Sequence, residues 1–248
     1  AYCYNDVKII CCYIDEQRKQ YGDITKIPLT NTGRVRLEVK KSCFRKVINP
    51  KTHKKHIPYK SLMDRLTLDV LEYAYAKQAF LGGYTHANAR YSKKLLSDVH
   101  SIDFTSSYPT VMLSEKYPMS KGTLIKLDMN SYDEFNTYLK QSDRVAVVMV
   151  ELWDIETKSD IPDDYISCSR LYKKGEQIMN NNGRVHKADY VQLIVTSVDL
   201  AQIVSCYNYT KIHIIDGYFY YVDYLPKEII ESILELYEKK TTLKGVKG

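Results

Sequence analysis

The sequence lacks any apolar run close to the roughly 18 residues that a membrane-spanning helix requires, so we expect no membrane partner. Its six cysteines show no paired ligand spacing, which argues against a zinc site. With no secretory leader they are expected to be reduced thiols of an intracellular protein. The chain also lacks a starting methionine and stops on a lysine-rich, helix-like stretch. We therefore expect a fragment of a longer intracellular protein.

Composition excludes a disordered chain and a disulfide miniprotein. The 248 residues are 44% hydrophobic and 27% charged, which is enough for one large or two small domains with real cores. Lys and Arg number 36 against 30 Asp and Glu, a net charge of +6. Such an excess indicates a polyanionic partner only where it is concentrated.

The excess is concentrated in a basic tract. From Arg34 to Lys60 there are ten Lys or Arg residues and one acid, Glu38. Two interpretations stay open: a solvated face, or a DNA contact whose affinity falls steeply with salt because counterions are released from the phosphates. The tract lacks periodicity and contains two prolines, so it is predicted to be an exposed connector with short helices.

Hydrophobic periodicity predicts a mixture of helices and antiparallel strands. Because the strands mostly occur without the regular helix alternation of a parallel sheet, the predicted class is α+β. The sheet is expected to be antiparallel. Helices are expected over 5–21 (led by Asp6), 61–79, 109–115, 132–139, 198–206 (capped by Ser197) and from 226 onward, and strands over 100–104, 123–127, 144–152, 190–195 and 212–222.

The segment from Asp103 to Pro109 carries the most informative chemistry. A carboxylate at a strand end, Asp103, can hold a divalent cation, and the adjacent Phe104 carbonyl is a second hard ligand. The free N–H groups at the start of the following helix favour phosphate oxygens. The flat ring of Tyr108, in the first turn of this helix, is expected to lie beneath the sugar of a bound nucleotide. It would leave no space for a 2′-hydroxyl on that sugar and so act as a steric gate. Taken alone, the same residues also fit an ordinary capped helix start.

Three motifs together resemble family B DNA polymerases. Asp103-Phe104-Thr105-Ser106-Ser107-Tyr108-Pro109 resembles their first polymerase motif, with Ser107 where Leu is usual. Tyr2-Cys3-Tyr4-Asn5-Asp6 matches the third exonuclease motif, and Phe80-Leu81-Gly82-Gly83-Tyr84 resembles the Tyr-x-Gly-Gly link between the exonuclease and polymerase domains. The three occur in the family's order. The chain is most similar to the protein-primed branch of phages, adenoviruses and linear plasmids.

The resemblance implies roles for particular residues. Asp103 would be the catalytic carboxylate and, with the Phe104 backbone carbonyl, would ligate metal: two Mg²⁺ ions in the complete site, or Mn²⁺ in their place. The implied nucleotide-binding residues are Ser106, Ser107, Tyr108 and Lys240. The implied exonuclease residues are Tyr2 and Asp6, with Asp6 on metal. The implied DNA-binding residues are Phe80, Gly82, Gly83 and Tyr84, where Phe80 replaces the usual Tyr but keeps a ring that stacks on a nucleotide.

The resemblance also implies partners and an arrangement of domains. The implied α+β fold is an antiparallel palm sheet with helices, an inserted strand-rich subdomain, and the C-terminal piece of an α/β exonuclease domain. The partners are a DNA template-primer, a dNTP and a terminal priming protein, with Lys173 and Lys174, beside Arg170, expected to contact the priming protein or the template. The location is intracellular, in the host cytoplasm if a phage or plasmid encodes the chain. The expected divisions are 1–79 for the exonuclease tail and basic connector, 80–118 for the link and palm, 119–215 for the inserted subdomain, and 216–248 for the palm return and start of the fingers.

The function expected from this resemblance is part of a DNA-directed DNA polymerase with an associated 3′–5′ exonuclease. The Asn-Ser-Leu-Tyr-Gly and Asp-Thr-Asp motifs are absent, and one aspartate cannot hold both metal ions, so the chain alone is expected to be inactive. The alternative is a catalytically dead, nucleic-acid-binding remnant from a mobile element or prophage. A stand-alone metal-dependent nuclease would need clustered acids near Asp6. The acids from Glu151 to Asp164 are rejected as a metal site, because we expect them in a loop without the glycine pattern of a calcium loop.

Overall fold

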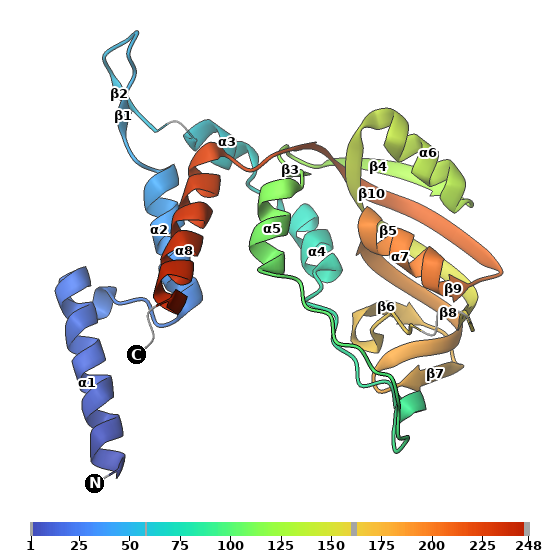
Figure 1. The fold of residues 1–248 in the computed structure, drawn as a ribbon. Coiled ribbons are helices and arrows are strands. Elements are labelled where there is room, and N and C mark those ends of the chain that lie inside the picture. The colour runs from blue at the N-terminus through green and yellow to red at the C-terminus, as the bar shows by residue number, and fades with distance from the viewer. Residues whose placement is uncertain (1, 58, 160–162, 246–248) are drawn as a thin grey trace. The chain divides into compact units, whose positions relative to one another are not determined.

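The computed structural model describes residues 2–57, 59–159 and 163–245, which fall into two compact units (Figure 1). Unit 1 comprises residues 1–60 and 226–248, and unit 2 comprises residues 61–225. Each unit is described by itself below. Among the helices in these ranges, none is long and apolar enough to cross a membrane. The four expected domains remain a prediction.

Unit 1 is built mainly from helices. The Thr30 hydroxyl accepts the Gly33 N–H (3.0 Å) and so caps the start of a helix that runs through the first part of the basic tract. This helix packs against the last helix of the chain, where the Ser232 and Ser42 hydroxyls lie 3.2 Å apart. The elements are α1 (Tyr2–Tyr21), η1 (Ile24–Lys26), α2 (Asn31–Cys43), β1 (Val47–Ile48), β2 (Lys55–His56) and α8 (Lys227–Gly245).

Two expectations for unit 1 need correction. Asp6 lies inside α1 and does not cap it, because the helix already begins at Tyr2. The basic tract is not a connector with short helices, because α2 has 13 residues and is followed by the β1–β2 hairpin. The sequence pattern of this helix is hard to recognise because its half-buried Leu37 and Val39 and its buried Cys43 are interspersed with Lys and Arg residues.

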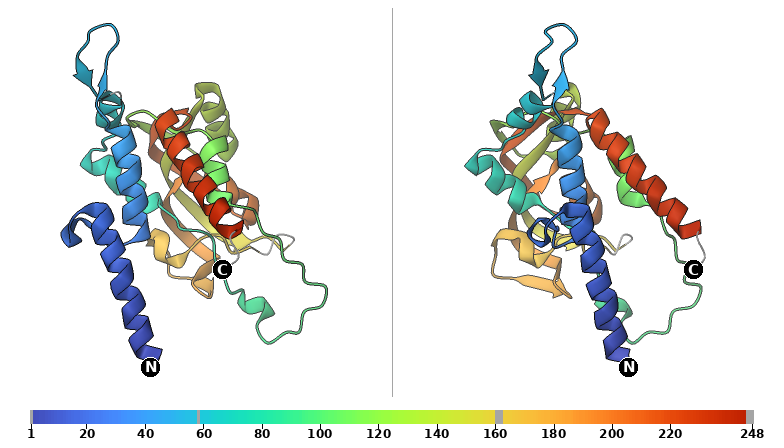
Figure 2. Two further views of the ribbon diagram at one scale, coloured as in Figure 1. Left: turned by 60° about the vertical axis from the view of Figure 1, so that its left-hand side comes forward. Right: turned by 90° about the vertical axis from the view of Figure 1, so that its left-hand side faces the viewer.

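Unit 2 contains the sheet and the helices that cover it. After α3 (Lys60–Arg65), which begins at the unit boundary, its elements are α4 (Val70–Ala79), η2 (Ala89–Tyr91), α5 (Ser107–Ser114), β3 (Tyr117–Pro118), β4 (Thr123–Met129), α6 (Tyr132–Ser142), β5 (Arg144–Thr157), η3 (Cys168–Arg170), β6 (Leu171–Lys174), β7 (Ile178–Asn181), β8 (Arg184–Thr196), α7 (Ser197–Cys206), β9 (Tyr207–Asn208) and β10 (Lys211–Asp223). Between α4 and α5 the chain leaves the sheet as a long loop whose helical turn is η2 (Figure 2).

Within the described residues, eight strands form one antiparallel sheet. Its main order is β3-β10-β5-β8-β6, while β4 pairs with β10, β7 with β8, and β9 with β5. The long strands β5, β8 and β10 form its centre, with Val150 opposite both Ile214 and Leu193. The mixture of helices with an antiparallel sheet confirms the α+β class predicted from the sequence.

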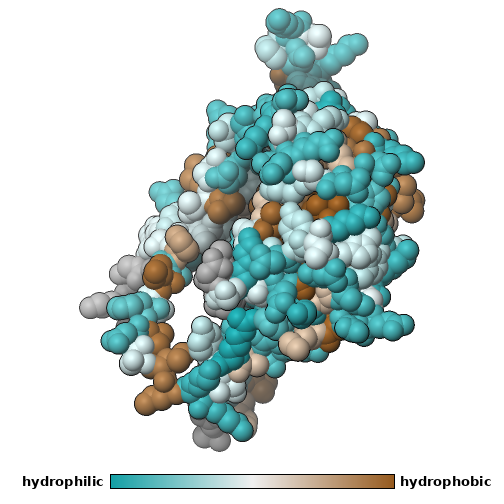
Figure 3. Space-filling model, turned by 90° about the vertical axis from the view of Figure 1, so that its right-hand side faces the viewer, coloured by the Kyte–Doolittle hydropathy of each residue, from teal (hydrophilic) through white to brown (hydrophobic). Residues whose placement is uncertain are grey.

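Alternation along β5 divides the sheet into two covered faces. One set of side chains, including Val148, Val150 and Leu152, packs with Phe135 of α6 and Leu200 of α7 in the larger core. The other face carries a smaller core in which Tyr75 and Ala79 of α4 pack with strand residues. Hydrophobic side chains on the surface seen in Figure 3 form separate small patches on a mostly hydrophilic face. The sheet is thus the rigid body on which α4 and its C-terminal extension are mounted.

Four further expectations for unit 2 are wrong. No strand forms at 100–104, because none of the described strands pairs with that segment. The helix expected over 61–79 is two helices, since the Asp69 side chain accepts the Glu72 N–H and starts α4 anew. Thr196, rather than Ser197, caps α7. Glu151, Asp154 and Glu156 belong to β5 and not to a loop, while Asp160 lies outside the described residues.

The end of the sheet face beyond α4 carries a polar cluster. His213 lies between two carboxylates, with Nδ1 3.0 Å from Glu151 and Nε2 2.8 Å from Asp128. Hydrogen bonds to Glu151 and Asp128 raise the pKa of His213 above its ordinary value. Partial burial acts to raise the pKa of Glu151, but hydrogen bonds from Tyr190 and His213 outweigh it and lower that pKa. Each described carboxylate of this cluster is therefore held by protein groups.

Gly217→Ala is expected to destabilise unit 2, because the sheet leaves no room for a side chain there. A Cβ at Gly217 would lie 2.6 Å from the Val147 carbonyl oxygen and 2.6 Å from Val148 Cγ1. The backbone of β5 cannot move aside cheaply, so we expect a loss of about 1–3 kcal/mol in the free energy of unfolding. Denaturant-induced unfolding measures it. Gly82→Ala is the matched control, since nothing lies within 4 Å of a Cβ there; equal losses in the two variants would contradict the crowding.

Candidate functional site

The segment from Asp103 to Tyr108 is an exposed turn into a helix. Ser106 has the left-handed φ of 53° and is the N-cap of α5, but its side chain makes no capping hydrogen bond. Pro109 has no N–H, so the first-turn amides are those of Ser107 and Tyr108, and no acceptor among the described residues receives them. These two N–H groups, at the positive end of the helix dipole, are free to bind an anion.

The side chains that the sequence assigned to nucleotide chemistry face solvent. Asp103 is exposed and lies outside any helix or strand, and Phe104 and Tyr108 are 78% and 72% exposed. The neighbouring Ile102 is also 83% exposed. The Asp103 carboxylate has no cationic partner in the part of the chain that the structure describes, so its oxygens are available to a ligand.

The glycine link approaches this segment directly. A Cβ placed on Gly83 would lie only 2.9 Å from the Tyr108 hydroxyl oxygen, whereas one on Gly82 would meet nothing within 4 Å. Two of the three motifs found in the sequence are therefore adjacent in unit 2, although 25 positions separate Gly83 from Tyr108. A side chain at Gly83 would displace the end of the Tyr108 ring.

Helix α4 fixes where the link begins. The Tyr75 hydroxyl donates to Asp216 of β10 (2.7 Å), and its ring meets Tyr218 edge to face at 5.3 Å. Burial is the main cause that raises the pKa of Tyr75, with the hydrogen bond to Asp216 second, so the hydroxyl stays protonated and keeps donating. Phe80 follows at the end of α4 and is 68% exposed.

A buried polar network fixes the other end of the link. Asp164 is fully buried and accepts from the side chains of Thr157 and Asn181, with Arg90 Nη2 3.4 Å away. Asn181 also accepts the Ala89 N–H (2.8 Å). Burial acts to raise the pKa of Asp164, but the hydrogen bonds and the Arg90 charge outweigh it and lower that pKa. The carboxylate is thus ionised and holds the chain after the link against β7 and β8.

Tyr84 ends the link in an aromatic stack. Its ring lies nearly parallel to Tyr165, with centroids 5.8 Å apart, and its hydroxyl donates to Asp163. The Arg184 guanidinium lies over the Tyr84 ring at 4.5 Å, donates to the Thr85 carbonyl (3.2 Å) and donates to the Tyr165 carbonyl (2.8 Å). Burial first, and the bond to Asp163 second, raise the pKa of Tyr84.

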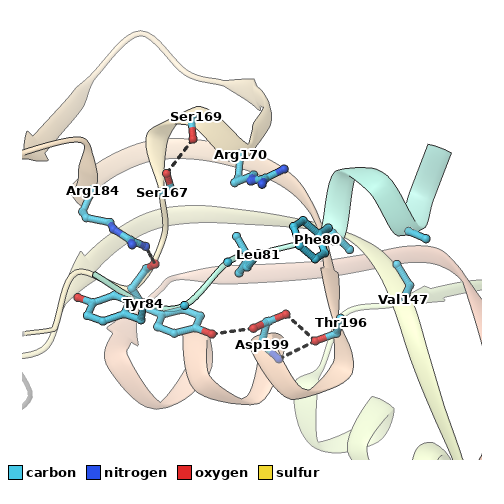
Figure 4. Close-up of a pocket in the computed structure, with 15 residues that line it drawn as sticks. Phe80, Leu81, Tyr84, Val147, Ser167, Ser169, Arg170, Arg184, Thr196 and Asp199 are labelled. Carbon is cyan, nitrogen blue, oxygen red and sulfur yellow. Dashed lines mark hydrogen bonds between the residues drawn. The ribbon is translucent and has the colours of Figure 1, made fainter. Parts of the chain in front are cut away.

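The link lines a groove of about 610 Å³ on unit 2. In Figure 4, Arg170 and Arg184 lie on one side of the segment from Phe80 to Tyr84, and Thr196 and Asp199 lie on the other. The Arg184 donors are used by backbone carbonyls, whereas the Arg170 side chain has no partner among the described residues. The groove therefore offers an exposed ring, an unpaired guanidinium and open glycine backbone to a ligand.

The remaining predicted residues lie on unit 1. Asp6 is exposed on α1, and the side chain of Tyr2 lies outside the described ones. Lys240 is exposed on α8, with Nζ 6.0 Å from the centroid of Tyr237. In the described residues there is no group of three or more His, Cys, Asp or Glu side chains placed to hold a metal ion.

Sequence reasoning missed several groove residues, among them Tyr165, Arg184 and Asp199. Each reaches the groove through contacts between distant positions, such as the bond from the Tyr165 hydroxyl to Asp199 (2.6 Å). Arg170, which the sequence analysis named only as the neighbour of Lys173 and Lys174, also lines the groove. No local pattern marks the missed residues, because they contribute one side chain each to a surface formed by folding.

Comparisons with known proteins agree on one family. The model of the type B DNA polymerases, organellar and viral, matches residues 1–247. The DNA polymerases of Bacillus phage B103 and Bacillus phage Nf are 26% and 24% identical to the chain over 222 residues, which is 88% of the chain and 33% of each relative. The chain spans about one third of the length of these relatives.

A solved structure shares the fold. Phi29 DNA polymerase complexed with primer-template DNA and incoming nucleotide substrates aligns with a TM-score of 0.51 at 20% identity. The alignment covers 74% of this chain and 29% of that one. At this level of identity the similarity shows a shared fold.

Asn181→Ala is expected to release the chain after the link. Its loss would leave the Ala89 N–H and one oxygen of buried Asp164 without partners, a cost of about 1–3 kcal/mol. We expect faster amide hydrogen exchange over residues 85–91, with a smaller effect on β5. Asn180→Ala is the matched control, because Asn180 is exposed and its side chain has no bond within the described residues. Unchanged exchange at 85–91 in Asn181→Ala would show that this network does not hold the segment.

Proposed function

Since the chain belongs to the type B DNA polymerases of organelles and viruses, we propose that it forms the nucleotide-binding side of the palm, the inserted subdomain and the tail of the exonuclease in a protein-primed enzyme. The resemblance to family B seen in the sequence is confirmed by the family match. The proposed reaction is template-directed addition of a deoxynucleotide to a 3′-hydroxyl, with pyrophosphate as the leaving group.

One observation carries this proposal: the glycine link meets the first polymerase motif, with Gly83 against the Tyr108 hydroxyl. Beside that contact, the open amides of Ser107 and Tyr108 suit the oxygens of a triphosphate. The Tyr108 ring then lies next to the anion site, where the sugar of a bound nucleotide would be. Its hydroxyl excludes a 2′-oxygen by occupying the same space, so the ring selects deoxyribose. Ser106 contributes the left-handed turn that exposes these amides.

The donors at Asp103 fit a hard divalent cation. A carboxylate with no cationic partner among the described residues, followed by a backbone carbonyl at Phe104, is an oxygen donor pair of the kind Mg²⁺ or Mn²⁺ prefers. Bound there, the ion would neutralise charge on the phosphates during transfer. Two donors cannot complete the site. We propose that the remaining ligands come from polymerase regions that the relatives contain and this chain does not span. The resemblance to family B also implies a triphosphate contact for Lys240, which lies on α8 of unit 1.

The groove beside the link is proposed to hold the template. Phe80 offers an exposed ring for a base, and Arg170 offers a guanidinium for a phosphate. Arg184 and Tyr84 act as a scaffold, since their polar groups already bind Thr85, Tyr165 and Asp163. Gly82 and Gly83 let a strand approach the backbone. Lys173 and Lys174, exposed on β6, are proposed contacts for a priming protein or the template.

Helix α1 is proposed to belong to the proofreading exonuclease. Asp6 is exposed on it and would ligate metal, while Tyr2 would orient the attacking water. Exonuclease activity and protein priming are proposed for the complete polymerase, of which this chain is one part.

Asp103→Asn in the complete polymerase is expected to lower the rate of nucleotide addition at least a hundredfold. A metal ligand supplies several kcal/mol of charge stabilisation, and about 3 kcal/mol corresponds to a factor of roughly a hundred. Primer extension with Mg²⁺ measures the rate, and duplex binding should be nearly unchanged. Asp98→Asn is the matched control, because Asp98 is an exposed aspartate of the same loop. Equal, measurable rates in the two variants would refute the metal role, whereas a wild type that adds no nucleotide would favour a catalytically dead remnant.

Gly83→Ala is expected to relax sugar selection by displacing the Tyr108 hydroxyl. The added methyl would lie 2.9 Å from an atom at the end of a movable side chain, so the ring shifts at little cost to folding. We expect the ratio of kcat/KM for dNTP over rNTP to fall roughly tenfold or more, as it should in Tyr108→Val.

The matched control for this variant is Gly82→Ala, which should keep the wild-type ratio because its Cβ has open space. In the Tyr108→Val background, Gly83→Ala should have no further effect on the ratio, since the hydroxyl it displaces is gone. An equal ratio in Gly83→Ala and Gly82→Ala would mean that Gly83 does not position the gate.

A further inference from the structure

The β1–β2 hairpin of unit 1 is a projecting element with no role in a core. It extends beyond the end of α2 in each view of the ribbon (Figures 1 and 2). Every residue from Pro50 to His56 is exposed, and Ile48 is 61% exposed. A two-stranded hairpin of this size gains little stability by itself. Its presence is therefore not explained by packing.

The hairpin loop nevertheless has a defined shape. The Asn49 side-chain oxygen accepts the N–H groups of Lys51 (2.8 Å) and Thr52 (3.1 Å). The Asn49 carbonyl accepts the His53 N–H (2.8 Å), and the Asn49 N–H donates to the Lys54 carbonyl (3.0 Å). One asparagine thus closes the loop on both sides. The side chains of the tip are presented from a fixed backbone, which lowers the entropy lost when they bind a partner.

The charge of the hairpin has one sign. Lys46, Lys51, Lys54 and Lys55 lie on it, and the sequence has no acid from Val39 to Met63. In the described part of the chain, none of these four lysines has a carboxylate partner. Their mutual repulsion is therefore not relieved within the chain.

The helical half of the basic tract differs in this respect. Arg34 lies 3.5 Å from both Gln17 and the Tyr13 hydroxyl, and Lys41 pairs with Glu38 at 3.1 Å. Lys41 and Arg45 also line a cleft together with Glu228, Glu231 and Glu235 of α8. Acids of α8 offset the charge of α2. Among the described residues, the hairpin is therefore the part of the tract in which no lysine pairs with an acid or lines a cleft with one.

We propose that the β1–β2 hairpin binds duplex DNA through its phosphates, without sequence preference. The choice of DNA as the polyanion rests on the proposed function. A two-stranded β-ribbon fits the major groove, which is about 12 Å wide, and lysines on such a ribbon face phosphates on either side. An acidic protein fits less well, because protein interfaces are anchored by buried aromatic or arginine side chains and residues 50–56 contain neither.

The test removes three tip charges and compares the salt dependence of binding. The hairpin variant is Lys51→Gln, Lys54→Gln and Lys55→Gln together. The matched control is Lys77→Gln, Lys126→Gln and Lys140→Gln, which removes three exposed lysines from unit 2 and leaves the same net charge. Both are made in the complete polymerase. A fluorescent duplex of 20 base pairs is titrated by anisotropy at several salt concentrations, with circular dichroism to check folding.

Each phosphate contact contributes about 0.9 to the slope of log K against log salt concentration. We therefore expect the slope to become shallower by roughly two to three in the hairpin variant and to stay unchanged in the control. Replacing the same three lysines by arginine should keep the wild-type slope. Equal slopes in the hairpin and control variants, or a wild type that does not bind the duplex, would overturn the proposal.

A second measurement separates this inference from the proposed function. At saturating primer-template the hairpin variant should add nucleotides at the wild-type rate, because the hairpin supplies affinity and not chemistry. A wild type that binds duplex with the steeper slope but adds no nucleotide would sustain the hairpin contact while refuting polymerisation. Normal polymerisation with equal slopes would refute the hairpin contact alone.

Discussion

The site depends on how the link from Phe80 to Tyr84 is held at both ends. At one end, α4 is fixed to the sheet by the bond from Tyr75 to Asp216. At the other end, the network around buried Asp164 fixes the chain from Asn88 to Arg90. Between these anchors the two glycines have no side chains, so side-chain packing cannot fix the position of their backbone. Their approach to Tyr108 is consequently a property of the sheet and of a buried carboxylate, both outside the motifs.

The sequence predicted the regular parts of unit 2 well, because their signals are local. Alternation identified the cores of β5 and β10, and the periodicity of 198–206 identified α7 to within one residue. It failed at 100–104, where apolar residues alternate as in a strand but no described strand pairs with them. A strand is defined by its partner, and a sequence pattern reports only one side of that pair.

The groove shows that sequence motifs identify only some of the residues of a site. The motifs located Phe80, Gly83 and Tyr108, because these residue types stand in a recognisable order. Arg184 and Tyr165 were not found, since their contacts to Thr85 and Tyr84 span 99 and 81 positions. Charge composition also could not predict which cations of the basic tract lie near acids. Only the packing of α2 on α8 shows which of them are offset. Sequence order identifies chemical groups, whereas the fold decides which of them remain available.

Two arginines in one groove illustrate why availability matters more than residue type. Arg184 spends its donors on the carbonyls of Tyr165 and Thr85, and its flat face covers Tyr84. Moving it to a phosphate would break these bonds and expose the stacked rings, so a ligand would have to supply that energy. Arg170 has no such bonds among the described residues and reaches into the same groove. A phosphate that entered the groove would therefore gain most from Arg170, whereas the bonds that make Arg184 a scaffold keep the link in place.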